Sequence, residues 1–312
     1  MLRRGSQLQA VVQALFVVFL WATSWVFIKV GLEEMPALTF AGLRYTLAFI
    51  CLLPLVFFSR QLAALRSVSR RTWGRLLILG VLLYAVTQGA VFVALALLPA
   101  VTVNLLWSFS SAAVALMGLV WLAERPTWFQ WLGVGLTILG AVFYFYPVAL
   151  PASQLWGVLV AGCGILANAG ASILGRDVNR RGDIPPLVVT VISMGIGSMA
   201  LLATGIAVQG FPNIGLRSWA IVAWLAIVNT AYAFTLWNQT LRTLSATESS
   251  IINGTMLIWI PVLAVVFLNE RVTVKEVFGL AVVGVGTLMV QLRQPWSMTR
   301  LLKSCLKIGI LR

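Results

Sequence analysis

The sequence has no histidine, only eight acidic residues and only three cysteines among its 312 residues. Without histidine, acid–base chemistry near neutral pH would have to use carboxylates, tyrosines or lysines. The cysteines, Cys51, Cys163 and Cys305, form neither a paired framework nor the Cys-x-x-Cys spacing of a metal site. We therefore predict that the protein has no disulfide, no bound metal and no cofactor.

Charged residues of both signs are also scarce, and hydrophobic residues take their place. Charged side chains make up 10% of the chain and hydrophobic side chains 61%, whereas about a quarter of the residues in a soluble domain are charged. This composition excludes a soluble protein. At roughly 20 apolar residues per bilayer crossing, the chain can supply on the order of ten membrane-spanning helices and little beyond them.

Ten apolar stretches are long enough to cross a bilayer. Their limits are 10–30, 37–58, 74–97, 99–123, 128–147, 155–175, 186–208, 218–240, 246–268 and 274–292. Only Leu98 and Pro99 mark the break between the third and fourth stretches, which predicts a tight hairpin. The basic N-terminus before the first stretch resembles a signal peptide. Because that stretch is too long and lacks a clean cleavage site, we interpret it as a retained first span.

The basic residues are distributed unevenly among the segments that join the spans. With a cytoplasmic N-terminus, seventeen Lys and Arg residues fall in cytoplasmic segments and four in outer segments, while Arg44 lies within a span. The positive-inside rule then predicts that both termini are cytoplasmic, in a bacterial-type plasma (inner) membrane. The formal net charge of +14 becomes a topology signal that matches anionic lipid. Its spread over several short loops argues against a nucleic-acid partner.

The two halves of the chain share a repeated segment. Residues 121–133 align without gaps to residues 267–279, an offset of 146 residues that pairs Glu124-Arg125 with Glu270-Arg271. Each copy also contains a capping box, Thr127-x-x-Gln130 in the first and Thr273-x-x-Glu276 in the second. The register of these features predicts a duplication. We therefore divide the chain into an N-terminal segment 1–9, five-helix repeats at 10–147 and 155–292, and a basic cytoplasmic tail 293–312.

The number of spans in each repeat determines the orientation of the second copy. Because five is odd, the second copy must cross the membrane in the opposite sense to the first. Inverted repeats of this kind are typical of carriers that alternate access around a site near the midplane of the bilayer. The sequence therefore favours transport as the function.

Several short motifs identify a family. They are the stretch 21–29 in the first span, Pro36 followed eight residues later by Arg44, and the Glu-Arg junction before a Gly-rich last helix in each half. Over residues 10–292 the chain resembles the EamA-type members of the drug/metabolite transporter superfamily. One departure is that Pro261 in the penultimate helix of the second half corresponds to Ala115 in the first, which leaves open whether the two halves bend alike.

The resemblance implies an all-α membrane protein with ten helices in two inverted five-helix repeats. It also implies a secondary transporter, an exporter of small organic metabolites such as amino acids. Drug or toxic-compound efflux remains the alternative, although residues 11–28 contain no glutamate like the one on which the four-helix multidrug relatives rely. A channel and a membrane enzyme are further alternatives. No HExxH, Gly-x-Ser-x-Gly or intramembrane acid pair indicates an enzyme.

Arg44 is the first candidate for a binding residue, because an arginine within a span costs at least about 2.5 to 3.5 kcal/mol and needs a partner. At 1.5 Å per residue from Ala37, it lies about 10 Å from the outer end of its helix. It could clamp helices together through backbone carbonyls, Glu33 or Glu34. Alternatively, its guanidinium could hold a substrate carboxylate in bidentate fashion.

The other candidates are polar and aromatic residues at helical spacing, which share one face of each helix. They are Trp21, Trp25, Tyr84, Gln88, Asn104, Trp107, Ser108, Asn168, Asn229, Tyr232 and Asn253. Such side chains are costly toward lipid, so they predict either contacts between helices or a cavity lined by rings and amides. A cavity of this kind would suit a small neutral or zwitterionic solute. The sequence leaves the oligomeric state open.

Overall fold

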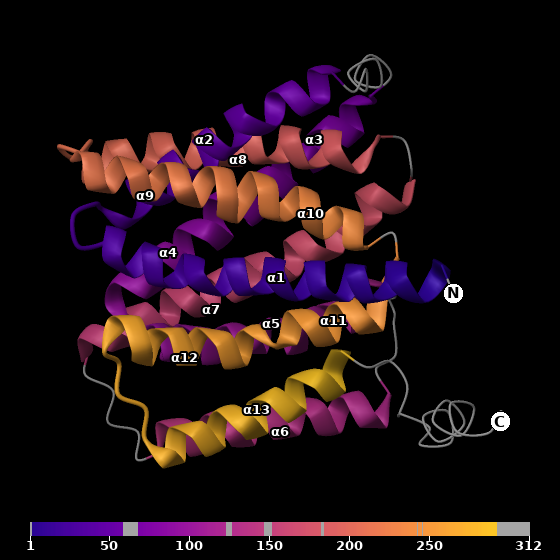
Figure 1. Ribbon diagram of the computed structural model, residues 1–312, viewed down its shortest axis with the longest axis vertical. Helices are drawn as coiled ribbons and strands as arrows, with labels where there is room; N and C mark the ends of the chain where they lie inside the picture. The colour runs from indigo at the N-terminus through magenta and orange to yellow at the C-terminus, as the bar shows by residue number, and fades with distance from the viewer. Residues whose placement is uncertain are drawn as a thin grey trace.

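The computed structural model describes residues 2–58, 68–122, 127–146, 152–181, 184–241, 243–244 and 246–291. Within these ranges all regular structure is helical, and it forms ten spans (Figure 1). The first half comprises α1 (Leu2–Gly31), α2 (Ala37–Phe58), α3 (Arg70–Gly80), η2 (Val81–Thr87), α4 (Gln88–Leu97), α5 (Ala100–Leu122) and α6 (Trp128–Phe145). The second comprises α7 (Ala152–Arg181), α8 (Pro186–Gln209), α9 (Leu216–Ala226), η3 (Ile227–Tyr232), α10 (Ala233–Thr240), α11 (Ala246–Gly254), α12 (Met256–Leu268) and α13 (Val274–Gln291).

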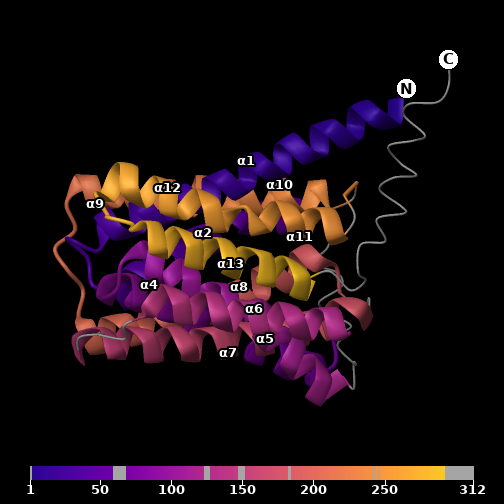
Figure 2. The same cartoon turned by 90° about the horizontal axis from the view of Figure 1, so that it is seen from below.

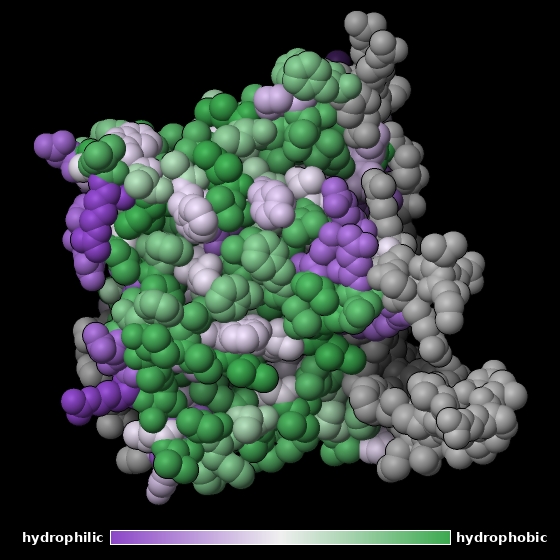
Figure 3. All heavy atoms as spheres, viewed as in Figure 1, coloured by the Kyte–Doolittle hydropathy of each residue, from purple (hydrophilic) through white to green (hydrophobic). Residues whose placement is uncertain are grey.

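The ten-span, all-α architecture predicted from the sequence is confirmed. Three of the spans contain more than one element: α3, η2 and α4 form the third, α9, η3 and α10 the eighth, and α11 and α12 the ninth. Hydrophobic residues cover most of the middle of the face seen in Figure 3, and hydrophilic residues gather at its left edge and toward its right side. An apolar belt of this kind matches the hydrocarbon core of a bilayer.

The helices run back and forth between two ends of the bundle (Figures 1 and 2). We call the end where α1 begins and α13 ends the terminal end. The opposite end, which carries the α4–α5 hairpin and the junction between α12 and α13, is the far end. The hairpin at Leu98 and Pro99 is as tight as the sequence predicts.

Both predicted capping boxes are confirmed. The backbone N–H of Gln130 donates to the hydroxyl of Thr127 at 3.3 Å, and the N–H of Thr127 donates back to the Gln130 side chain at 2.9 Å. Glu276 and Thr273 make the same two bonds at 3.3 and 2.6 Å. These bonds satisfy N–H groups that α6 and α13 would otherwise leave unpaired. Glu124, Arg125 and the tail 293–312 lie outside the described residues.

The repeat extends through much of the helical structure. Four pairs of elements begin 146 residues apart, the offset found in the sequence: α3 and α9, η2 and η3, α5 and α11, and α6 and α13. Two of these elements, η2 and η3, are π-helical turns. A π turn within an α-helical span is rare and is found frequently at functional sites. Because it recurs at the same position in both halves, these two segments are candidates for a functional role.

The last helices of the two halves, α6 and α13, pack closely along their lengths (Figure 2). A Cβ atom on Gly133 would lie 2.7 Å from the carbonyl oxygen of Gly286, and one on Gly140 would lie 2.8 Å from that of Gly279. Gly279 and Gly286 occupy the positions of Gly133 and Gly140 in the repeat, so the two contacts are copies of one another. Only glycine allows the backbones to approach this closely.

The first helix of each half packs against the other half. α1 contacts the eighth and ninth spans, from α9 to α12, while α7 contacts the third and fourth spans, from α3 to α5. The second spans, α2 and α8, pack against each other. The packing units therefore differ from the halves of the sequence, because α1 and α7 have exchanged places.

Candidate functional site

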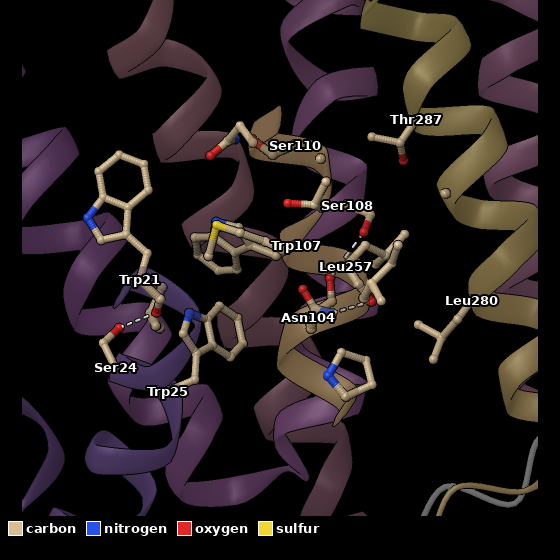
Figure 4. A pocket seen from close by; sticks show the side chains of 18 of the residues that line it. Trp21, Ser24, Trp25, Asn104, Trp107, Ser108, Ser110, Leu257, Leu280 and Thr287 are labelled. Atoms are coloured by element: carbon tan, nitrogen blue, oxygen red, sulfur yellow. Dashed lines mark hydrogen bonds between the residues drawn. The ribbon is translucent and has the colours of Figure 1, made fainter. Parts of the chain in front are cut away.

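A cavity of about 1030 Å³ lies among helices of both halves (Figure 4). In Figure 4 the α1 side chains Trp21 and Trp25 face it from one side, and Leu280 and Thr287 of α13 lie on the other. Ten of the twelve candidate residues line the cavity, namely Trp21, Trp25, Arg44, Gln88, Asn104, Trp107, Ser108, Asn168, Asn229 and Asn253. The polar faces predicted on separate helices thus border the same cavity.

Tyr84 and Tyr232 do not line this cavity. Tyr84 is buried, with its ring 5.8 Å from the ring of Tyr45, and borders a second space of about 370 Å³ between the third span, α7 and α8. The side chain of Tyr232 is 52% exposed on the surface of the bundle. Both tyrosines lie in the π segments, where a turn contains more residues and α-helical spacing no longer gives the face.

Arg44 is buried, with 5% of its surface exposed, and it lines the cavity. Its Nε donates to the hydroxyl of Thr230 at 3.2 Å, and its guanidinium carbon lies 5.1 Å from the ring centre of Tyr45 and 5.9 Å from that of Phe92. In the described part of the chain, no carboxylate pairs with it. The terminal guanidinium nitrogens are therefore left to serve the cavity.

The predicted partners of Arg44 have other contacts or lie elsewhere. Glu34 pairs with Arg217 at 3.6 Å and accepts a hydrogen bond from the hydroxyl of Ser218. Glu33 is exposed. A hydroxyl on η3 takes the place of the carbonyls or carboxylates that an interhelical clamp was expected to use.

The π turn of η3 places that hydroxyl. Thr230 donates its own proton to the carbonyl of Leu225, five residues earlier, at 2.8 Å. Thr87 in η2 makes the equivalent bond to the carbonyl of Leu82 at 2.7 Å. Because the hydroxyl of Thr230 donates its proton to the backbone, its oxygen is oriented to accept a hydrogen bond from Arg44.

Asn104 on α5 reaches a carbonyl that a proline has freed. Pro261 has no backbone N–H, so the carbonyl of Leu257, four residues earlier, has no helical donor. Nδ2 of Asn104 donates to that carbonyl at 3.5 Å. The ninth span is also broken at Thr255 between α11 and α12, whereas α5 is continuous. The fourth and ninth spans, which correspond in the repeat, therefore differ in helical continuity.

Asn229 joins η3 to the first helix. Its Nδ2 donates to the carbonyl of Leu20 and to the hydroxyl of Thr23 at 3.3 Å. Its Oδ1 is buried and has no hydrogen-bond partner among the described residues. A buried acceptor without a partner is costly, and Asn229 itself is fully buried in the wall of the cavity.

Helical spacing does not select two other residues that line the cavity and form hydrogen bonds with the predicted candidates. Tyr45 follows Arg44 directly and donates its hydroxyl proton to Gln88 at 2.7 Å. Ser110 accepts from Asn168 at 2.6 Å. Neither residue continues a polar row on its own helix, so periodicity could not select them. What distinguishes them is a hydrogen bond to a residue on another helix, and the sequence does not show which helices are neighbours.

The described lining of the cavity carries a single positive charge and no negative charge. Among the described residues that line it, Arg44 is the only charged one, and the rest are amides, hydroxyls, rings and aliphatic side chains. A single cation without a carboxylate favours an anionic or neutral group over a cation.

Glu270 forms hydrogen bonds between the two halves at the far end. Its carboxylate accepts from the backbone N–H groups of Ala100 at 2.6 Å and Val101 at 3.1 Å, which begin α5. The sequence identified Glu270 as a junction residue near the start of a helix. The helix that it caps belongs to the other half of the chain.

Comparison with known proteins identifies the family. The model of the EamA-like transporter family matches residues 8–146 and again residues 155–292. The chain belongs to the EamA-like transporter family. It is thus a multi-pass membrane transporter of the drug/metabolite transporter superfamily and not an enzyme, and its two-repeat architecture is the one that the resemblance implied.

Relatives of this EamA-like protein carry the name of transporter. It is 23% identical over 290 residues to a Bacillus subtilis protein named uncharacterized transporter YoaV, covering 88% of this chain and 93% of that one. An uncharacterized transporter of Archaeoglobus fulgidus is 27% identical over 259 residues, covering 81% and 86%. A solved crystal structure has the same fold, with a TM-score of 0.65 at 17% identity over 90% of this chain and 97% of that one.

Proposed function

We propose that this EamA-like transporter exports a small organic metabolite that carries a carboxylate, with zwitterions such as amino acids as the first class to test. The observation that carries the proposal is the cavity with Arg44 as the only charged residue among its described lining. A guanidinium binds a carboxylate through two parallel hydrogen bonds. Since Thr230 occupies only Nε, the terminal nitrogens provide that pair of donors.

The remaining lining fits the rest of such a molecule. The amide and hydroxyl side chains of the lining, such as Asn104, Ser108 and Asn253, are acceptors for an ammonium or amide N–H. Trp25 and Trp107 supply apolar surface for carbon atoms. A few placed polar groups in a largely apolar pocket are typical of small-molecule sites.

We infer that transport uses alternating access. Inverted repeats allow two equivalent arrangements of helices around one site. The exchange of α1 and α7 suggests the moving units: α1 with the eighth and ninth spans, and α7 with the third and fourth. In this proposal, the pairs α2 with α8 and α6 with α13 join the two units.

The proposed orientation places the terminal end in the cytoplasm of a bacterial-type cell, with the inner membrane as its location. Its support is the excess of Lys and Arg in the segments at that end. Export would then carry the solute from the terminal end to the far end.

Flux measurements on purified protein in liposomes test the proposal. We expect saturable flux of N-acetylglycine and of some amino acids, and no flux of the lipophilic cation tetraphenylphosphonium beyond its passive rate in protein-free liposomes. Arg44→Gln should lower flux of the carboxylates by about tenfold or more, since a hydrogen bond to a charged group contributes about 1.5 to 3 kcal/mol. Arg217→Gln, which removes an exposed arginine at the far end, is the matched control.

Two results would contradict the proposal. One is wild-type flux in Arg44→Gln, which would remove Arg44 from the site. The other is transport of tetraphenylphosphonium without any carboxylate, which would identify a drug efflux carrier instead.

A further inference from the structure

Two helices that lie next to each other, α12 and α13, do not pack along their lengths. α12 packs on α1 and α5, whereas α13 packs on α6 and also reaches α5 and α11. Figure 1 shows that α13 approaches α11 near the terminal end and diverges from α12 toward the far end. The result is a wedge between α12 and α13, within the membrane-spanning part of both helices.

The cavity extends into this wedge. Its lining includes one row on each helix, Ile258, Val262 and Val266 on α12 and Val277, Ala281 and Val285 on α13. The five larger side chains of these rows are 48–65% exposed on the outside of the bundle. Residues that both line a cavity and face outward lie at its mouth. We call these six residues the lateral mouth.

The lateral mouth differs chemically from the inner wall of the cavity. All six of its residues are aliphatic, and they lie in the spans that cross the hydrocarbon core. The inner wall carries Arg44, Asn104 and Asn229. The cavity therefore changes from polar to apolar between the middle of the bundle and the lipid.

A mouth of this composition favours one kind of molecule. A hydrated solute would lose water at an aliphatic opening without gaining hydrogen bonds, which is unfavourable. An apolar chain gains from the same surface, by about 0.8 kcal/mol for each methylene in general. At the far end, Glu270 joins the α12–α13 junction to α5.

We propose that the lateral mouth is a portal between the bilayer and the cavity for amphipathic carboxylates, with the carboxylate at Arg44 and the apolar tail between α12 and α13. This inference rests on the proposed transport of carboxylates. It adds the apolar tail and the route of entry. A lipid acyl chain and a second copy of the chain are the other occupants of the wedge, and the test below separates them.

Gly284 provides the means to obstruct the portal. It lies on α13 beside the lateral mouth, and a Cβ atom there would meet the end of the Leu257 side chain at 3.0 Å. Because that contact is with the tip of a flexible side chain, Gly284→Trp can be accommodated while its ring fills the wedge. A Cβ atom on Gly135 of α6 would meet nothing within 4 Å, so Gly135→Trp is the matched control.

The experiment compares two carboxylates with the same head group, N-acetylglycine and N-decanoylglycine, in liposomes. We expect wild-type protein to carry both. Gly284→Trp should lower the flux of N-decanoylglycine relative to N-acetylglycine by about tenfold, the factor that corresponds to roughly two buried methylene groups. Gly135→Trp should leave both fluxes unchanged. Ala281→Leu, a smaller obstruction of the same row, should give a change in the same direction.

The outcomes distinguish the portal from the function on which it rests. Equal loss of both fluxes in Gly284→Trp and Ala281→Leu, or no loss, would overturn the portal and leave the carboxylate transporter in place. Wild-type protein that carries only N-acetylglycine would also overturn it, and would assign the wedge to a lipid chain or, if cross-linking in the membrane captures a dimer across α12 and α13, to a second copy. Absence of flux for both compounds would overturn the portal, and together with absence of amino-acid flux it would overturn the proposed function as well.

Discussion

The carboxylate of Glu270 in the second half of the chain accepts the backbone N–H of Ala100 in the first half at 2.6 Å. Its other oxygen accepts the N–H of Val101 at 3.1 Å. A negative charge at a helix N-terminus is stabilised by unpaired N–H groups and by the helix dipole. One side chain in a five-residue junction thus holds the far ends of α5, α12 and α13 together.

Loss of this cap should destabilise the protein. We expect Glu270→Ala to lower the free energy of unfolding by about 1 to 2 kcal/mol, because the N–H groups of Ala100 and Val101 lose their acceptors. Glu270→Gln should have a smaller effect, since an amide oxygen accepts without a charge. Thermal unfolding in detergent measures both. Glu33→Ala, an exposed acid at the same end, is the control, and equal Tm values for the three variants and wild type would contradict the role of the cap.

Thr230 should position Arg44 for substrate. In Thr230→Val, Nε of Arg44 loses its acceptor, so we expect the affinity for N-acetylglycine to fall by about two- to tenfold, as for loss of one hydrogen bond. Thr230→Ser should retain the wild-type value. Thr235→Val, which removes a hydroxyl bonded to the carbonyl of Ala231, tests for a general effect of losing a threonine hydroxyl. An unchanged affinity in Thr230→Val would separate Thr230 from binding.

The glycine contacts between α6 and α13 should tolerate no added carbon. We expect Gly133→Ala and Gly279→Ala each to destabilise the protein by about 1 to 3 kcal/mol, since the new Cβ would overlap a backbone carbonyl and force the helices apart. Gly135→Ala on the free side of α6 should be neutral. Thermal unfolding of the three variants compares them directly. A similar Tm for all three would mean that α6 and α13 adjust without cost.

Asn104 and Pro261 should be coupled through the carbonyl of Leu257. Asn104→Leu removes the donor to that carbonyl, and Pro261→Ala supplies a backbone N–H in its place. We therefore expect Asn104→Leu to cost about 0.5 to 1.5 kcal/mol more in the wild-type background than in Pro261→Ala, within the range of interhelical hydrogen bonds in membranes. A double-mutant cycle of unfolding free energies measures the difference. Additive effects would show that the two residues act independently.

The number of spans and the repeat could be predicted from the sequence because lipid imposes a simple rule. Every residue that crosses the hydrocarbon core must form backbone hydrogen bonds within its helix, so long apolar runs identify spans such as 37–58 directly. Polar residues that would be costly toward lipid must face inward. Asn104 and Asn229, which this rule selects, are both buried.

The π turns and the exchange of the first helices could not be predicted. Helical spacing indicates which face of α1 is buried, and it does not indicate that the covering helices belong to the second half. A π turn depends on backbone bonds five residues apart, for which the side chains of 81–87 and 227–232 give no pattern. This is why Tyr232, which the spacing predicts to face inward, lies exposed, and why Tyr84, although buried as predicted, borders a separate space. For the same reason the sequence does not indicate Thr230 as the partner of Arg44.

The exchange of α1 also sets an order for biosynthesis. Asn229, which donates to the carbonyl of Leu20, is 209 residues further along the chain. At a synthesis rate of 5 to 20 residues per second, α1 waits about 10 to 40 s before this partner is made. Its hydroxyls are suited to the delay, because Thr23 and Ser24 donate to carbonyls of α1 itself, at 2.7 and 2.6 Å. The first helix can therefore remain in the bilayer without its partners from the second half until the eighth and ninth spans emerge from the ribosome and pack against it.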